Sequence, residues 1–283
     1  MQKTTYLPLL AVVSFTLSSI ICEQVRAQSS QLNSAVPIVA HRGASKDAPE
    51  NTIAAFMEAW KQGADAIEGD FHLTKDGEIV CVHDANIKHY TGENLEVRNL
   101  TLKELKSYDF GKWHAPTFAG TVIPTLREVL AMIPEGKKIY IEVKSDASLV
   151  PIMLEHLKKS GLTPEQIVVI SFHTEVIAAV EKARPELKTY WLTSFKKTAE
   201  GTQRPSTHHI LSTLRKLKTD GVSTHYDGAT ATRVNDVQKA GFEYHVWTVD
   251  QIELAKRLYA TGVQSITTNI PGKLRAGISP PPK

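Results

Sequence analysis

The chain carries two acidic residues, Glu68 and Asp70, two positions apart within the apolar segment 65–71. Side chains at i and i+2 of a β-strand point to the same face, so a strand here would aim both carboxylates into one space. A second apolar segment, 138–144, carries Glu142. Carboxylates in apolar surroundings cost several kcal/mol unless they are neutralised. The pattern therefore predicts that the three acids hold a cation, and oxygen ligands alone suit Ca²⁺ or Mg²⁺ rather than zinc.

Two histidines, His41 and His83, stand at the ends of the apolar segments 37–41 and 78–83. Imidazole changes its charge near neutral pH, so two histidines arriving beside three acids predict general acid–base catalysis. The alternative is that each histidine is a polar residue with ordinary hydrogen-bond partners and no chemical role.

Two basic residues accompany these groups. Arg42 follows directly after His41, and Lys144 stands two positions after Glu142. If Gly43 lets the chain turn, Arg42 lies in a loop from which it can reach an anion. A guanidinium matches a phosphate bidentately and an ammonium adds a point charge, so the whole set suits a phosphodiester better than a peptide or a sugar. The alternative is a structural network in which Arg42 or Lys144 simply neutralises the acids.

These side chains meet only if several strand ends converge. Apolar strand-like segments alternate with helical segments along the chain, which is typical of a parallel sheet with right-handed crossovers. Eight such strands favour an α/β fold of the (β/α)8 TIM-barrel type, in which the carboxyl ends of the strands form one mouth. An open doubly wound sheet is the alternative, but the chain has no glycine-rich dinucleotide turn to support it. The expected strands are 37–41, 65–71, 138–144, 167–172, 188–193, 221–225, 243–248 and 263–268, with 78–83 as a hairpin return. The expected helices are 53–62, 101–107, 125–131, 149–160, 174–183, 207–218, 232–240 and 251–260, several of them stopped by a following glycine.

One connection is far longer than the others. The part 85–123, between the second and third barrel strands, predicts an insertion that acts as a lid or substrate wall. Its aromatic residues Trp113 and Phe118 could line a groove or could pack the insertion down. Cys81, inside the return strand, is expected to be buried and unreactive.

The two ends of the chain carry no barrel pattern. Residues 1–27 predict a secretory signal peptide, with an apolar stretch at 7–22 and cleavage near Ala27. The protein is thus expected to be exported to a periplasm or secreted, with one domain at 28–278 and a disordered tail at 279–283. After cleavage no stretch is long enough to span a membrane. The net charge of +3 over 283 residues does not indicate nucleic-acid binding. The sequence makes no prediction of oligomeric state.

The motifs that carry these residues resemble those of the glycerophosphodiester phosphodiesterases in order and spacing. They are HRG (41–43), PENT (49–52), E-x-D (68–70), KDG (75–77), HD (83–84) and E-x-K (142–144). Similar segments follow at 101–105, 123–130, 246–250 and 266–272.

The resemblance implies a barrel enzyme that hydrolyses glycerophosphodiesters to sn-glycerol 3-phosphate and an alcohol with one divalent cation. It further implies a role for each matching position. Glu68, Asp70 and Glu142 would be metal ligands, His41 and His83 the general base and general acid, and Arg42 and Lys144 the phosphate binders. Glu50 would either bind the metal or order His41, and Trp247 and Phe172 would be walls for the glycerol moiety.

The chain departs from the family pattern after the HD motif. Where the family often has Arg-Thr-Thr, this chain has Lys88-His89-Tyr90-Thr91, which bears on the pocket for the leaving alcohol. Phe71-His72 also replaces a commoner small apolar pair.

Two other functions are compatible with the same motifs. A lysophospholipase D would keep the chemistry and take a lipid substrate. An exported, non-catalytic phosphodiester-binding protein would have lost a ligand or a histidine, and none is lost.

Overall fold

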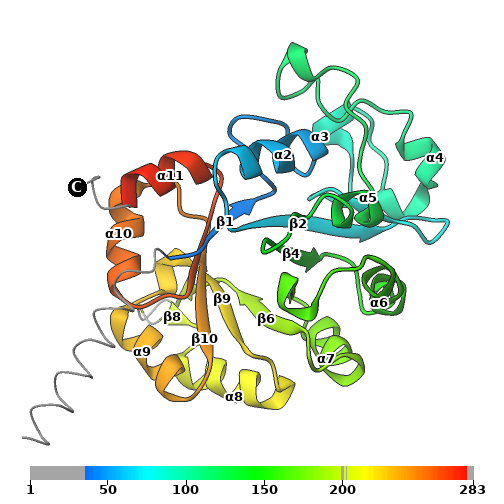
Figure 1. Ribbon diagram of the computed structural model, residues 1–283. Helices are drawn as coiled ribbons and strands as arrows, with labels where there is room; N and C mark the ends of the chain where they lie inside the picture. Colours follow the sequence, from blue (N-terminus) through cyan, green and yellow to red (C-terminus); the bar gives the residue numbers. More distant parts are fainter. Residues whose placement is uncertain (1–35, 199–200, 202, 279–283) are drawn as a thin grey trace, which may run out of the picture. The chain divides into compact units, whose positions relative to one another are not determined.

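The strands form one closed sheet. The structure is a computed structural model that describes residues 36–198, 201 and 203–278. Within these residues, eight parallel strands close into a barrel, because β1 pairs with β2 on one side and with β11 on the other. Figure 1 shows the strands at the centre and the helices around them. The barrel strands are β1 (Ile38–His41), β2 (Ala66–Leu73), β4 (Lys138–Val143), β5 (Ile167–Ser171), β6 (Lys188–Thr193), β9 (Gly221–His225), β10 (Glu243–Trp247) and β11 (Ser265–Thr268). The predicted TIM barrel is confirmed.

The register of the first strands already brings the acids and a histidine together. His41 of β1 stands beside Glu68 of β2, and Asp70 of β2 stands beside Glu142 of β4. His41 and Glu142 lie at or near the carboxyl ends of β1 and β4, and Glu68 and Asp70 stand beside them on β2, which continues three residues beyond Asp70 to Leu73. Barrel enzymes place their sites at this face.

The helices begin and end much as the sequence predicts. Gly63, Gly161, Gly241 and Gly262 all take a positive φ directly after or close to a helix end, as helix-stopping glycines do. The helices are α2 (Ile53–Lys61), α3 (Lys88–Thr91), α4 (Leu102–Leu105), α5 (Leu126–Leu130), α6 (Leu149–Lys159), α7 (Thr174–Ala183), α8 (Thr207–Leu217), α9 (Ala231–Lys239), α10 (Ile252–Ala260) and α11 (Pro271–Ile278).

Helix α8 ends within one residue of the predicted 207–218, but no glycine stops it. Lys218, not Gly221, takes the left-handed conformation, with φ +61°. Gly221 instead lies in β9, where an added Cβ would meet the backbone carbonyl of Glu243. That glycine marks a close approach of β9 and β10 rather than a helix stop.

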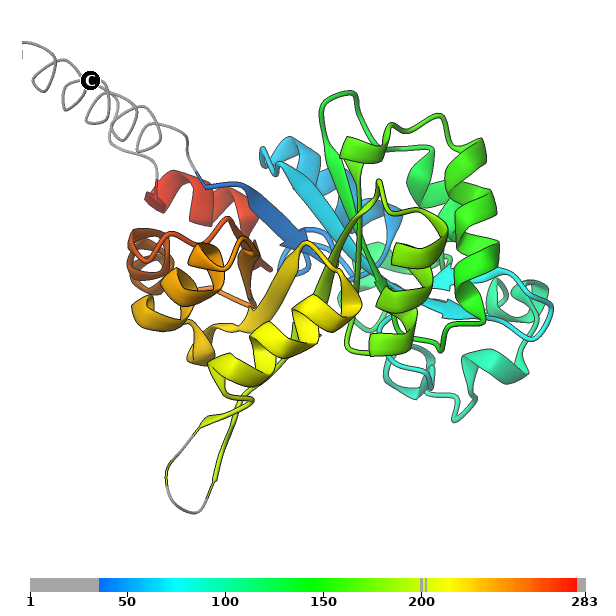
Figure 2. The same ribbon diagram turned by 90° about the horizontal axis from the view of Figure 1, so that it is seen from below.

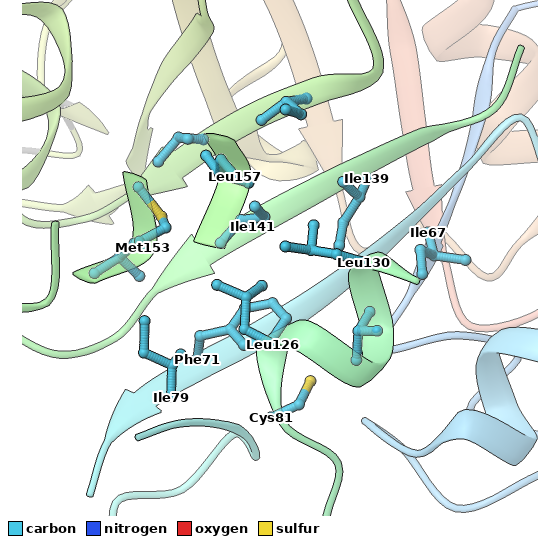
Figure 3. Close-up of a cluster of buried hydrophobic side chains, with 14 of the residues drawn as sticks. Ile67, Phe71, Ile79, Cys81, Leu126, Leu130, Ile139, Ile141, Met153 and Leu157 are labelled. Carbon is cyan, nitrogen blue, oxygen red and sulfur yellow. The ribbon is translucent and has the colours of Figure 1, made fainter. Parts of the chain in front are cut away.

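The core between the strands and the outer helices is apolar. Figure 3 shows one cluster, in which side chains of β2, β3 and β4 meet those of α5 and α6. Cys81 belongs to this cluster and is buried, as predicted, and burial raises the pKa of its thiol well above the ordinary value. Such a thiol stays protonated at neutral pH and is a poor nucleophile.

The insertion between β2 and β4 is confirmed and has a small apolar core of its own. It begins after β3 (Ile79–Cys81), the predicted hairpin return, and contains α3 and α4. Its core includes Ile87, Tyr90, Val97 and Phe110. Trp113 packs on this core and donates its indole N–H to the carbonyl of Phe110.

The structure also contains a short hairpin that the sequence did not predict. It consists of β7 (Lys196–Lys197) and β8 (Gln203–Arg204), which pair antiparallel after β6 (Figure 2). No helix in the described part of the chain is long and apolar enough to cross a membrane. The predicted signal peptide and tail lie outside the described residues, so the domain limits and the export of the protein stay predictions.

Candidate active site

Three carboxylates form the centre of the site. Glu68, Asp70 and Glu142 are buried, and each offers an oxygen within 4.8 Å of the other two. They reach one point because alternate positions on β2 share a face and β4 is the neighbouring strand in register. The sequence predicted this convergence.

The two basic side chains beside this cluster do not balance all of its charge. Burial, and then repulsion by Asp70, raises the pKa of Glu68 well above its ordinary value and that of Glu142 to about 7. Burial alone would also raise the pKa of Asp70, but Arg42 and Lys144 outweigh it and lower that pKa to about 2. The two basic side chains therefore neutralise only part of the cluster.

One oxygen of the cluster is available to an ion. Oε2 of Glu68 accepts the backbone N–H of Arg42 at 2.9 Å, whereas Oε1 is buried and has no hydrogen-bond partner. An orphaned buried carboxylate oxygen between two other carboxylates fits a hard divalent cation, which takes oxygen ligands. Glu68, Asp70 and Glu142 would hold it.

Glu50 lies outside this group of three. Its Oε1 and Oε2 each accept a hydrogen bond from Nη1 of Arg42 at 3.0 Å, and Oε1 also accepts from the hydroxyl of Tyr90 at 2.9 Å. Of the two predicted roles, metal ligand or partner of His41, the described contacts correspond to neither. Glu50 holds Arg42.

Arg42 and Lys144 approach the acids from two sides. Nε of Arg42 is 3.2 Å from Oδ2 of Asp70. Nζ of Lys144 is 2.9 Å from Oε1 of Glu142 and 3.5 Å from Oδ1 of Asp70. Arg42 follows β1 in a left-handed conformation, with φ +56°, and Gly43 follows with φ +84°. The predicted turn at Gly43 is confirmed.

His41 is oriented by residues from the other end of the chain. Its Nδ1 is 2.7 Å from Oδ1 of Asn269, while the amide nitrogen of Asn269 donates to Asp250 at 2.7 Å. Because Asp250 can only accept, the amide oxygen must face His41, and so Nδ1 of His41 carries the proton. Burial, and then the charge of Arg42, lowers the pKa of His41 to about 4, which leaves Nε2 unprotonated at neutral pH.

His83 has a different partner. Its Nδ1 is 2.7 Å from Oδ1 of Asp84, so a carboxylate faces this ring where an amide oxygen faces His41. An ionised carboxylate can only accept, so Nδ1 of this ring carries a proton. The buried ring of His72 contacts the carbonyl oxygen of His83 through Nε2 at 3.0 Å and thus supports the strand end that carries it.

The side chains meet in one cavity of about 270 Å³. Trp247 and Phe172 form one wall, with their rings edge to face and 5.6 Å between centroids. Phe172 is 42% exposed, so it is not a core residue, and its ring faces the mouth of the barrel. The cavity is lined by His41, Arg42, Glu68, His83, Tyr140, Glu142, Lys144, Ile170, Phe172, Leu192, Ser223, Trp247 and Thr267.

A second, open hollow of about 600 Å³ adjoins the first at His83 and Lys144, which line both. Its lining is polar and comes largely from the insertion, with no aliphatic side chain larger than that of Ala85. The other residues that line it are His72, Asp84, Asn86, Lys88, His89, Asn94 and Glu96. Trp113 and Phe118 line neither cavity.

Sequence reasoning assigned no role to three polar residues that order the site. Asn51, with φ +58°, donates its amide to Asp70 at 2.8 Å and accepts the backbone N–H of Asp70 at 3.0 Å. Asn269 and Asp250 orient His41 as described above. All three lie within the family motifs quoted from the sequence, so their place in a motif was the available signal. Their partners stand 19 to 228 positions away, and no local pattern reports such contacts.

Comparison with known proteins agrees with this geometry. The chain matches the model of the glycerophosphoryl diester phosphodiesterase family over residues 41–273. A glycerophosphodiester phosphodiesterase of Caldanaerobacter subterraneus subsp. tengcongensis is 36% identical over 245 residues, which cover 84% of this chain and 95% of that protein. One from Bacillus subtilis is 31% identical over 251 residues, covering 82% and 83%.

A solved structure shows the same fold. It is an Oleispira antarctica phosphodiesterase in complex with the product sn-glycerol-3-phosphate, with a TM-score of 0.77 and 26% identity over 86% of this chain and 96% of that chain. The family match runs from the first catalytic candidate, His41, to α11, and so spans the barrel and its insertion. The chain therefore belongs to the glycerophosphoryl diester phosphodiesterase family and is an enzyme of that family.

Proposed function

We propose that the protein hydrolyses glycerophosphodiesters to sn-glycerol 3-phosphate and an alcohol, with one divalent cation, Ca²⁺ or Mg²⁺, held by Glu68, Asp70 and Glu142. The observation that carries this proposal is the buried cluster of three acids, with an unpartnered oxygen on Glu68. Glu68 and Glu142 of this cluster line the same cavity as two histidines and two basic side chains. When bound, the cation supplies positive charge that favours ionisation of a substrate hydroxyl and neutralises a phosphoryl oxygen.

His41 acts as the general base. Its Nδ1 proton is committed to Asn269, so the free Nε2 can take a proton from the 2-hydroxyl of the glycerol moiety. The oxygen of that hydroxyl then forms a bond to phosphorus, and the bond from phosphorus to the departing alcohol breaks. The low pKa of His41 supports this assignment, because a base must be neutral before it reacts.

His83 acts as the general acid. Its Nδ1 is held by the carboxylate of Asp84, so Nε2 is the ring atom that can give a proton to the departing oxygen and let the alcohol leave. The cyclic phosphate is opened by water with the roles reversed: His83 takes a proton from water, and His41 returns one to the 2-oxygen.

Arg42 and Lys144 stabilise the charge that builds on the phosphoryl oxygens. Both already lie against the acid cluster, so a phosphate that binds there meets them without rearrangement. Phe172 and Trp247 form the wall for the glycerol moiety. Since His83 and Lys144 border both cavities, we place the departing alcohol in the polar hollow lined by the insertion.

A lysophospholipase D would share this machinery. Its best sequence support was a pair of aromatic residues in the insertion, Trp113 and Phe118, but neither lines the cavity that holds the catalytic candidates. No contact in the described part of the chain favours a lipid over a glycerophosphodiester, so we keep the simpler substrate.

The test is the release of sn-glycerol 3-phosphate from glycerophosphocholine before and after chelation, with Ca²⁺ or Mg²⁺ then restored. We expect release that stops on chelation and returns with the cation. We also expect His41→Ala and His83→Ala each to lower the rate by about 10²–10⁴. His156→Ala, on the outer helix α6, is the control and should keep the wild-type rate.

Two results would contradict the proposal. Release that persists in excess chelator would remove the cation from the mechanism. Near-wild-type turnover by both histidine variants would remove the acid–base assignment. If glycerophosphocholine is not cleaved with any cation but a lysophospholipid is, the lipid phosphodiesterase is correct instead.

A further inference from the structure

A tyrosine hydroxyl of the insertion contacts Glu50, the residue that holds Arg42. Tyr90, in α3, is buried with only 5% of its surface exposed, and its hydroxyl donates to Oε1 of Glu50 at 2.9 Å. The two residues are 40 positions apart, and they join the insertion to the loop that follows β1. Neither residue is among the three acids that would bind the cation.

Glu50 in turn accepts hydrogen bonds from Arg42. Both of its carboxylate oxygens accept from Nη1 of the guanidinium at 3.0 Å, and Nε of the same guanidinium faces Asp70 at 3.2 Å. Nη1 is thus hydrogen-bonded to Glu50, whereas Nε lies at ion-pair distance from Asp70 without a hydrogen bond to it. The remaining nitrogen, Nη2, is the one available to a phosphate.

Arg42 needs this external support. Its backbone takes φ +56°, a conformation in which a residue other than glycine is strained, and the long side chain has many rotamers. Asp70 attracts the guanidinium at Nε without a hydrogen bond. The hydrogen bonds to Glu50 therefore hold the plane of the guanidinium.

We propose that Tyr90 is a positioning residue for phosphate binding: it holds Glu50, which in turn holds the plane of Arg42 so that Nη2 faces the phosphate of the substrate. The proposal deepens the proposed function, since it assumes that Arg42 binds that phosphate. The insertion would then support phosphate binding through Tyr90, in addition to lining the hollow beside His83.

The surroundings of Tyr90 suit this task. Its ring packs against Phe110 and Trp113, with centroids 5.8 and 5.7 Å away, so the position of the hydroxyl is set by the apolar core of the insertion. Burial, and then the charge of Glu50, raises the pKa of Tyr90, so its hydroxyl is protonated and can donate at neutral pH.

The first experiment compares Tyr90→Phe with Tyr108→Phe. Both tyrosines pack on the insertion core, but only the hydroxyl of Tyr90 contacts Glu50. We expect Tyr90→Phe to raise KM for glycerophosphocholine and to lower kcat/KM about tenfold, the low end of the usual cost of removing a support of a ligand-binding group. Tyr108→Phe should leave both constants unchanged, and the two variants should unfold at similar temperatures.

A double-mutant cycle shows whether the effect runs through Arg42. In an Arg42→Lys background the fork that Glu50 orients is absent, so adding Tyr90→Phe should change kcat/KM less than twofold. A tenfold loss in both backgrounds would mean that Tyr90 acts independently of Arg42 and would overturn the proposal.

Binding of inorganic phosphate, measured by calorimetry on the cation-loaded protein, provides a readout that does not require turnover. We expect Tyr90→Phe to weaken phosphate binding about tenfold relative to Tyr108→Phe. Equal binding by the two variants would overturn the inference even if the enzyme is active. If the wild-type protein binds phosphate but cleaves no glycerophosphodiester, the proposed function fails while the role of Tyr90 is still decided.

Discussion

At the scale of single residues, the orientation of His41 depends on Asp250. Both oxygens of this carboxylate accept hydrogen bonds, from the side chain and backbone of Asn269 and from the hydroxyl of Thr268. In Asp250→Asn one of these acceptors becomes an N–H₂ donor that faces another donor. The amide of Asn269 is then free to turn its nitrogen toward His41, which would place the ring proton on the nitrogen that must act as the base.

We therefore expect Asp250→Asn to lower kcat about 10–100-fold, in the range found when the partner of a functional histidine is lost. The exposed Asp236→Asn, in α9, is the matched control and should have no effect. The measurement is kcat as a function of pH, together with the unfolding temperature. Wild-type kcat in Asp250→Asn would show that the orientation of His41 does not come from this chain of hydrogen bonds.

Residue types alone identified the acids, the histidines and the basic side chains of the site, because each sits in a short motif at the end of an apolar strand. The same motifs did not show what each side chain bonds to. Glu50 illustrates the difference: the family resemblance implied a metal ligand or a partner of His41, and its contacts are with Arg42 and Tyr90. Partners chosen by side-chain packing between distant segments have no sequence period that could reveal them.

At the scale of elements, the turn after β1 requires a glycine at position 43, and a comparison of Gly43 with Gly63 tests this requirement. Gly43 and Gly63 both have a positive φ, +84° and +78°, so alanine is strained at either position. The two positions differ in the room available for a side chain. An added Cβ at Gly43 would lie 2.5 Å from the carbonyl carbon of Ala55 in α2, whereas at Gly63 it would meet nothing within 4 Å.

We expect Gly63→Ala to lower the free energy of unfolding by about 1–2 kcal/mol, the cost of the left-handed conformation alone. Gly43→Ala should cost more and should also lower kcat/KM, since the backbone must shift beside Arg42. Urea unfolding and phosphodiesterase assays of the two variants measure both effects. Equal stability losses with full activity in each would show that the turn at Gly43 tolerates a side chain.

The elements themselves were largely predictable because they repeat one pattern: an apolar strand, a helix of period 3.6, and a glycine. The exceptions break that pattern for physical reasons. The hairpin of β7 and β8 contains Lys196 and Lys197, with no apolar alternation to mark it, and it does not join the barrel sheet. The helix predicted over 101–107 shortens to Leu102–Leu105, with a capping box at Thr101 and Glu104 that stabilises a single turn.

At the scale of the whole molecule, the barrel holds a polar network around Glu243 that the sequence did not predict. The ring of His245 stacks on Tyr190 with centroids 4.0 Å apart, and both side chains contact Glu243, Tyr190 at 2.6 Å and His245 at 3.3 Å. Lys188 joins Glu243 and Asp220 at 2.8 Å each. This network links β6 and β10 across β9, the strand that lies between them.

The network predicts how stability depends on pH. Burial alone would raise the pKa of Glu243, but hydrogen bonds from His245, Lys188 and Tyr190 outweigh it and hold that pKa well below its ordinary value of 4.5. A carboxyl group with a lowered pKa in the folded state stabilises the fold above its unfolded pKa, and the contribution is lost as the pH falls through the lower, folded value.

We therefore expect Glu243→Gln to lower the unfolding temperature by a few degrees at neutral pH, with a difference from wild type that shrinks progressively below about pH 4.5. Glu253→Gln removes an exposed pair with Lys256 and should change the unfolding temperature little at any pH, because exposed ion pairs contribute at most about 1 kcal/mol. A Glu243→Gln difference that stayed constant down to pH 3 would mean that the hydrogen bonds, and not the ionisation of Glu243, stabilise this part of the barrel.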